Sequence, residues 1–318
     1  MVQAVVYVSG MPIPPPAPRA EPIRRGYGMM LMIVSSVIIS FGGLIVRSME
    51  EAGPSQINFW RSLALIITFG GIFLFRHKRE SIRNFRKVGY GGVLAGLSIS
   101  VAALAFMQAL AHTTVANTMF TLASIPFITA ALAWIFLKEQ LGKITLVTMV
   151  FAAAGVIMMV VDGIGLGSIY GNVMALVTAL GFSGFAVIVR QNRHVDMLPA
   201  LIISAVLVLF ISVGVSYDEL IVPWKDILLC FLWGSIFSGL GNVMFVAASK
   251  HLVAGELTLF MLLEFALSPF WVWLVVSEAP TTWALAGGML VIIAVAVRAI
   301  IEMQSGGKVF KRGRPSPA

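Results

Sequence analysis

The chain has 318 residues, of which 59% are hydrophobic and only 11% are charged, and its mean hydropathy is +0.96. Soluble domains are about 45–50% apolar and about 25% charged, so this composition excludes an ordinary water-soluble protein. The net charge of +8 does not indicate a nucleic-acid partner, because the basic residues are spread over separate loops instead of one face.

The first 26 residues are unlike the rest of the chain. The stretch VSGMPIPPPAPRAEPIRR (8–25) is polar and rich in proline, and the apolar AVVYV before it is too short for the core of a signal peptide. We therefore expect residues 1–26 to form a disordered cytoplasmic tail. Residues 303–318 are expected to form a second, basic cytoplasmic tail.

Between these tails, long apolar stretches alternate with short polar breaks. About 20 apolar residues in a helix span a bilayer core of about 30 Å. Ten stretches are predicted as transmembrane helices one to ten: 27–46, 58–75, 90–110, 117–137, 143–161, 168–189, 198–216, 225–248, 255–276 and 281–302. They are about twice as long as barrel strands and lack period-two alternation. The predicted fold class is an all-α polytopic membrane protein.

The Lys and Arg residues predict its orientation. Ten spans place both termini on one side, and the segments of that side hold 19 of the 22 basic residues. The other side has only Arg47, Arg61 and Lys225. Because basic residues accumulate in cytoplasmic loops, both termini are expected in the cytoplasm, in the inner membrane of a bacterium.

The two halves of the chain end in similar ways. WIFLKE (134–139) and WVWLVVSE (271–278) match at their Trp and at their closing Glu, with an offset of 139 residues. The same offset superimposes helix five on helix ten. Because five is an odd number, the second half enters the membrane inverted, as in many secondary transporters. Residues 27–161 and 168–302 are therefore predicted to form two inverted five-helix repeats. The closing residues, Glu139 and Glu278, are expected to cap the helices that follow them.

The chain resembles the EamA-type ten-helix carriers of the drug/metabolite transporter superfamily over about 27–302. The resemblance is carried by PFITAALAWIFLKEQL (126–141), the Arg in SQINFWRSLAL (55–65), GNVMALVTALGFSGFAVIVR (171–190) and LLEFALSPFWVWLVVSE (262–278). The family usually has Glu-Pro in helix nine, whereas here Glu264 lacks the adjacent proline and Pro269 follows later. Helix four keeps Pro126 but has Ile125 in place of Glu. The resemblance implies a central cavity lined by helices one to four and six to nine, with helices five and ten outside.

Polar side chains in transmembrane helices are expected to face the bundle interior. The candidates for substrate binding in the cavity are Glu264, Arg61, Asn117, Asn242, Gln108, Thr121, Ser124, Ser238 and Ser268. Hydroxyl side chains also allow close helix packing, so the amides at 108, 117 and 242 favour the cavity more strongly.

Among the charged residues within predicted spans, Glu264 and Arg61 are the candidates for a role in the cavity. Glu264 is near the midplane, where an ionised carboxylate costs about 2.5 kcal/mol or more, so it is predicted to contact substrate or to couple transport to protons. The other interpretation is a neutral Glu that makes one interhelical hydrogen bond. Arg61 either snorkels to the interface or enters the cavity. If both reach the cavity, Arg61 and Glu264 would suit a zwitterion such as an amino acid. The alternative is that the two charges pair with each other.

The sequence lacks the motifs of the enzymes considered. It has no H-E-x-x-H, GFSGF (181–185) lacks the second Gly of a G-x-S-x-G elbow, and no P-loop is present to use ATP. The four His fall at different loops, so neither a metal nor another cofactor is expected.

The predicted function is a secondary transporter that moves a small polar or amphiphilic metabolite by alternating access, with amino-acid export favoured. The alternatives are uptake or efflux of a vitamin, a nucleoside-derived or a drug-like compound, and a channel-like or lipid-handling protein. The expected partners are a small-molecule substrate and the bilayer. Proton or exchange coupling and a homo-oligomer stay open.

Overall fold

The computed structural model describes residues 7–8, 11–12, 25–113, 115–139, 141–161, 169–216, 220–276 and 282–312. The predicted tail at 1–26 lies mostly outside these residues, and its described part holds two short antiparallel strands, β1 (Tyr7–Val8) and β2 (Met11–Pro12). The helices of the first half are α1 (Arg25–Ile39), α2 (Gly42–Arg47), α3 (Pro54–His77), the 3₁₀ turn η1 (Lys78–Glu80), α4 (Ser81–Lys87), α5 (Gly89–His112), α6 (Val115–Leu122), α7 (Ile125–Leu137) and α8 (Lys143–Val161). Those of the second half are α9 (Ile169–Gln191), α10 (Leu198–Ser216), α11 (Trp224–Leu232), the π-helical η2 (Trp233–Leu240), α12 (Gly241–Ala248), α13 (Ala254–Phe260), α14 (Leu262–Val276) and α15 (Thr282–Arg312).

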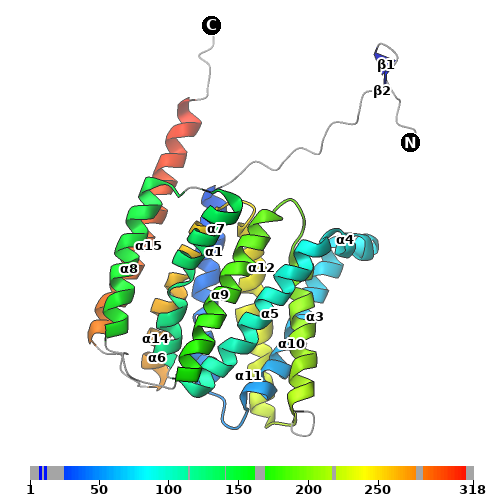
Figure 1. The fold of residues 1–318 in the computed structure, drawn as a ribbon, viewed down its shortest axis with the longest axis vertical. Helices are drawn as coiled ribbons and strands as arrows, with labels where there is room; N and C mark the ends of the chain where they lie inside the picture. Colours follow the sequence, from blue (N-terminus) through cyan, green and yellow to red (C-terminus); the bar gives the residue numbers. More distant parts are fainter. Residues whose placement is uncertain are drawn as a thin grey trace.

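The described chain forms a helical bundle whose long helices run side by side (Figure 1). Seven segments are long and apolar enough to cross a membrane: Arg25–Arg47, Pro54–Lys87, Gly89–His112, Ile169–Gln191, Leu198–Val215, Trp224–Ala248 and Ala254–Val275. Three shorter apolar helices, Ile125–Leu137, Lys143–Gly155 and Ala286–Val297, lie in the remaining predicted stretches. Outside the β1–β2 pair, an all-helical fold with several candidate membrane spans is therefore confirmed in the described residues, whereas ten spans and an inverted repeat stay predictions.

Several long helices are interrupted in the middle of the bundle. Helix α1 ends before Ser40 and α2 begins at Gly42, where a Cβ atom would lie 2.8 Å from the indole nitrogen of Trp233. The break between α6 and α7 precedes Pro126, whose ring nitrogen cannot donate a helical hydrogen bond. Non-helical backbone at this depth is tolerated where it is buried in protein or lines a cavity.

The packing places α8 against α15 at one edge of the bundle, away from α3 and α10 (Figure 1). Helices α5 and α9, α3 and α10, and α1 and α12 also pack closely. Small residues permit this approach, as at Gly181, where a Cβ atom would lie 2.9 Å from the Ser98 carbonyl oxygen. Large buried side chains such as Phe69, Phe185 and Phe260 belong to one hydrophobic cluster that joins helices of both halves.

Candidate functional site

A central cavity lies among the helices of both halves. Its empty volume is about 1390 Å³, part of it open to the surroundings, and most of its lining residues are apolar. Residues of α1, α2, α3, α5, α6 and α7 line it from the first half, and residues of α9, α10, η2, α12 and α14 from the second. Among the described residues, α8 and α15 contribute no side chain to this lining. The packed pair α8 and α15 therefore stands apart from the cavity.

Arg61 is held against the cavity wall by two residues of η2. Its Nη2 donates a hydrogen bond to Ser238 Oγ at 3.1 Å, and its Cζ lies 4.4 Å from the centroid of the Trp233 ring. This geometry is a cation–π contact, in which the guanidinium keeps its positive charge. The Arg61 Nε is buried and has no hydrogen-bond acceptor in the described structure. Arg61 therefore presents an unneutralised guanidinium to the cavity.

Glu264 brings an acidic side chain to the same cavity. It is the third residue of α14 and lines the cavity with a partly buried side chain. Within the described chain it makes no side-chain hydrogen bond and no ion pair, with Arg61 or with any other cation. The sequence left open whether Arg61 and Glu264 serve a substrate together or pair with each other. In the structure they do not pair with each other.

The other predicted site residues fall into three groups. Asn242, Ser238 and Ser268 line the cavity with Arg61 and Glu264, and Asn242 Nδ2 donates to the Ser238 carbonyl at 2.8 Å. Three others lie outside its lining: Gln108, Thr121 and Ser124, of which Ser124 Oγ donates to the Thr121 carbonyl at 2.6 Å. The side chain of Asn117 falls outside the described part of the structure.

Sequence reasoning missed several lining residues. Trp233, Ser62, Thr178 and Ser204 all line the cavity. The hydroxyl residues could have been found from polarity alone, since each lies in an apolar stretch. Trp233 carried no such signal, because a tryptophan in a membrane helix usually indicates packing or an interface.

Three polar bridges join the two halves at one end of the bundle. We call this the basic end, defined as the end where α1 begins and where α3, α7, α9 and α12 end (Figure 1). The bridges are Arg25 Nη2 to Glu256 Oε1 at 2.6 Å, Arg190 Nε to Glu139 Oε1 at 2.8 Å, and His77 Nε2 to Asp196 Oδ2 at 2.9 Å. Each one links a residue before 162 to a residue after 168, so together they hold the basic ends of the two halves together.

Glu139 takes a different role from the expected cap of α8. Its Oε1 accepts from Arg190, and its Oε2 accepts from the backbone N–H of Ala254 at 3.2 Å, at the start of α13. It therefore stabilises a helix of the second half. Its counterpart in the sequence comparison, Glu278, lies outside the described residues.

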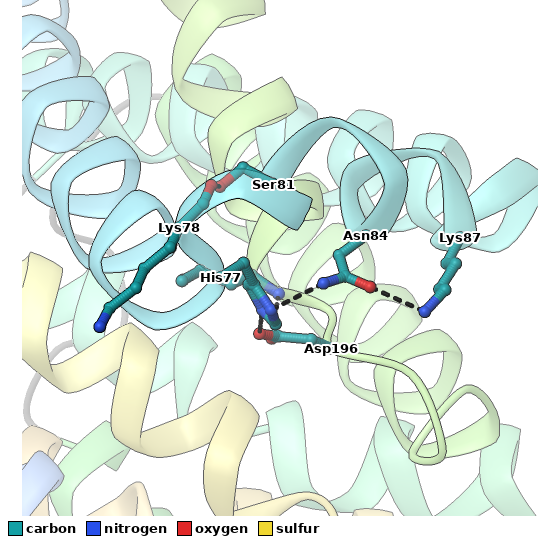
Figure 2. Close-up of polar contacts among 7 residues, drawn as sticks. His77, Lys78, Ser81, Asn84, Lys87 and Asp196 are labelled. Atoms are coloured by element: carbon teal, nitrogen blue, oxygen red, sulfur yellow. Dashed lines mark hydrogen bonds and ion pairs between the residues drawn. The ribbon is translucent and has the colours of Figure 1, made fainter. Parts of the chain in front are cut away.

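The third bridge belongs to a chain of hydrogen bonds. Figure 2 shows His77 between Asp196 and Asn84, with Asn84 Nδ2 2.9 Å from His77 Nδ1. Asn84 Oδ1 accepts from Lys87 Nζ at 2.8 Å, and Asp196 Oδ1 accepts from the N–H of Leu198 at 3.1 Å. The chain ties α4, the end of α3 and the start of α10 into one unit.

Comparisons with known proteins point to transport. Residues 26–161 match the model of the EamA-like transporter family. The pseudopaline exporter CntI of Pseudomonas aeruginosa is 23% identical over 277 residues, covering 84% of this chain and 94% of that protein. Human solute carrier family 35 member G1 is 24% identical over 301 residues, covering 87% of this chain and 80% of that protein.

The fold also matches a solved one. A crystal structure of another protein superposes with a TM-score of 0.71 at 15% identity, covering 88% of this chain and 99% of that chain. At this identity the likeness establishes a shared fold alone.

Proposed function

We propose that this chain is a membrane transporter of the EamA type, in the drug/metabolite transporter superfamily, and that it works as a secondary carrier for a small polar or amphiphilic metabolite. One observation carries the proposal: Arg61 and Glu264 line the same cavity without pairing. A buried charge without a counter-charge is costly. A substrate with a carboxylate and an amine would offset both costs, so an amino-acid-like compound is favoured.

Export is the favoured direction, because one relative of similar length is named an exporter. The basic end carries most of the Lys and Arg residues, which supports placing it in the cytoplasm of a bacterium, with the protein in the inner membrane. In this orientation, substrate enters from the basic end and leaves at the end where α2, α5 and α10 terminate, called here the opposite end.

The packing supports two inverted repeats. If the first five predicted helices correspond to the last five, the contact of α5 with α9 has its counterpart in the contact of α1 with α12. Under the same correspondence, the contact of α3 with α10 maps onto itself, and so does the contact of α8 with α15. A two-fold relation of this kind suits alternating access, in which one repeat rocks against the other around a fixed site.

The cavity supports a state that faces the opposite end. Its lining reaches Val46 and Leu110, each within two residues of the end of α2 or α5. Towards the basic end, Phe182 and Phe245 line the cavity, and the fully buried Phe185 packs behind them. The three polar bridges lie beyond these rings. Alternating access then requires that the aromatic cluster and the bridges separate in the second state.

Thermal-shift titration of the purified protein tests the proposal. Amino acids, vitamins, nucleosides and amphiphilic cations are compared, because a ligand that binds only the folded state raises the melting temperature with its concentration. Positive compounds are then assayed for saturable transport in proteoliposomes. We expect Glu264→Gln and Arg61→Gln each to weaken binding of a zwitterion by about 30-fold or more. Glu80→Gln, at an exposed carboxylate of the basic end, is the matched control.

A second candidate substrate class follows from the mainly apolar lining. An amphiphilic, drug-like cation would use Glu264 and the apolar walls without Arg61. A shift that is lost in Glu264→Gln and kept in Arg61→Gln selects this class. Saturable transport that neither variant affects would contradict the proposed site.

A further inference from the structure

A second, smaller cavity lies at the basic end, between the two halves. Its empty volume is about 570 Å³, part of it open to the surroundings. Tyr27 of α1 and Arg76 of α3 line it from the first half. The second half contributes Asp196, Leu198, Val243, Val246, Ala247, Lys250 and His251. None of these residues lines the central cavity, so this is a separate site.

The charges in this smaller cavity do not balance. Arg76, Lys250 and His251 supply basic groups, and among the described residues Asp196 is the only acidic one in its lining. Both oxygens of Asp196 are already engaged, one with His77 and the other with the N–H of Leu198. Arg76 and Lys250 form no ion pair and no side-chain hydrogen bond within the described residues. The cavity therefore offers a guanidinium and an ammonium group to an anion.

The position of the cavity indicates which kind of anion it would bind. It lies near the ends of helices that are long and apolar enough to cross a membrane, and basic pockets between such helices suit anionic lipid headgroups. Tyr27 packs edge-on against His251, with 5.7 Å between the two ring centroids, and is half-exposed. This is typical of an aromatic residue at a membrane–water interface. A guanidinium fork and an ammonium group in the lining of one cavity suit phosphate oxygens.

We propose that this cavity binds a phosphate group, which bridges Arg76 of the first half and Lys250 of the second. The phosphate belongs to an anionic lipid headgroup or to a soluble phosphate compound. Because its two cationic partners lie on different halves, the bound phosphate holds the basic end closed, beside the His77–Asp196 bridge. It thus stabilises the state that faces the opposite end.

Melting temperatures measured at constant ionic strength test this site without a transport assay. One arm compares nanodiscs that contain phosphatidylglycerol with nanodiscs of phosphatidylcholine alone. The other arm adds inorganic phosphate, with chloride as the reference, to protein in phosphatidylcholine nanodiscs. The variant Arg76→Gln/Lys250→Gln changes two exposed side chains, so it is expected to fold. The control Arg83→Gln/Arg193→Gln removes two exposed charges from the same end outside the cavity.

We expect one arm to raise the melting temperature of the unaltered protein, with at least half of the rise lost in the cavity variant and the rise kept in the control. A rise with phosphatidylglycerol alone assigns the site to a lipid headgroup, and a rise with inorganic phosphate assigns it to a soluble phosphate. Equal losses in both variants would reduce the effect to general surface charge and overturn the proposal. The absence of a rise in both arms would overturn it as well. None of these outcomes depends on the substrate of the central cavity.

Discussion

The guanidinium carbon of Arg61 lies 4.4 Å from the centroid of the Trp233 ring. The ring covers one face of the guanidinium and keeps its charge, whereas a carboxylate in the same place would cancel it. Gly42 makes room for the indole, since a Cβ atom there would lie 2.8 Å from the ring nitrogen. Trp233 is therefore a positioning residue for the proposed substrate contact.

Removing the Trp233 ring is expected to weaken binding of an anionic substrate group. A partly desolvated cation–π contact contributes about 1–2 kcal/mol, so Trp233→Leu should raise the Kd about tenfold and Trp233→Phe distinctly less. Titration of each variant by thermal shift measures the difference. If Leu and Phe lower the melting temperature of the protein alike and leave the Kd unchanged, the ring serves packing only.

The sequence predicted the apolar stretches well, because length and hydropathy are local properties of the chain. Glu264 and Asn242 were singled out for a similar reason, since a polar group inside lipid needs an interior position. Gln108 satisfied the same criterion and does not line the cavity. Polarity identifies a side chain that needs a partner, but the rotation and depth of its helix decide which partner it finds.

Other features depend on contacts between distant parts of the chain. The role of Trp233 arises from the π-helical η2, which brings its ring under Arg61. Arg190 and Glu139 are 51 residues apart in sequence. Each lies next to a loop, where a charged side chain is usually expected to be exposed to solvent. No local pattern marks such a residue as a bridge between halves.

Breaking the Arg190–Glu139 bridge is expected to open the basic end. Glu139→Gln leaves the guanidinium of Arg190, which is 7% exposed, without its counter-charge, and this penalises the closed arrangement. Accessibility is read from Thr178→Cys, a cavity position whose hydroxyl bonds only within its own helix. The background is Cys230→Ser, which removes the sole cysteine.

Labelling with a membrane-impermeant maleimide from each face measures the effect. Labelling from the basic end should rise several-fold in Glu139→Gln and stay unchanged in Glu80→Gln, the exposed control. Equal labelling rates in all three proteins would mean that this bridge does not close the cavity.

Asp226 is expected to stabilise the opposite end. Its fully buried carboxylate accepts the backbone N–H groups of three consecutive residues, Glu50 at 3.1 Å, Glu51 at 3.0 Å and Ala52 at 3.0 Å. Asp226→Asn keeps the size but turns one acceptor into a donor that faces N–H groups. A loss of about 1–3 kcal/mol in the free energy of unfolding should follow.

The neighbouring residue provides the control for this prediction. Lys225 pairs with Glu50, but both side chains are exposed, so Lys225→Gln should change stability by less than about 1 kcal/mol. Thermal unfolding in one detergent compares the two variants. A similar melting temperature for both would show that the buried carboxylate adds no more than a surface ion pair.

The contact between α8 and α15 gives a prediction about stability apart from the cavity. A Cβ atom on Gly155 would lie 2.7 Å from the carbonyl oxygen of Gly287 and 2.9 Å from a methyl carbon of Val291. Gly155→Ala should therefore force the two helices apart and cost about 1–3 kcal/mol. Gly70→Ala is the matched change within a helix, because nothing lies within 4 Å of a Cβ atom there.

Since α8 and α15 do not line the cavity, Gly155→Ala should lower the melting temperature and leave the substrate Kd unchanged. A changed Kd in this variant would mean that the outer helix pair also shapes the site.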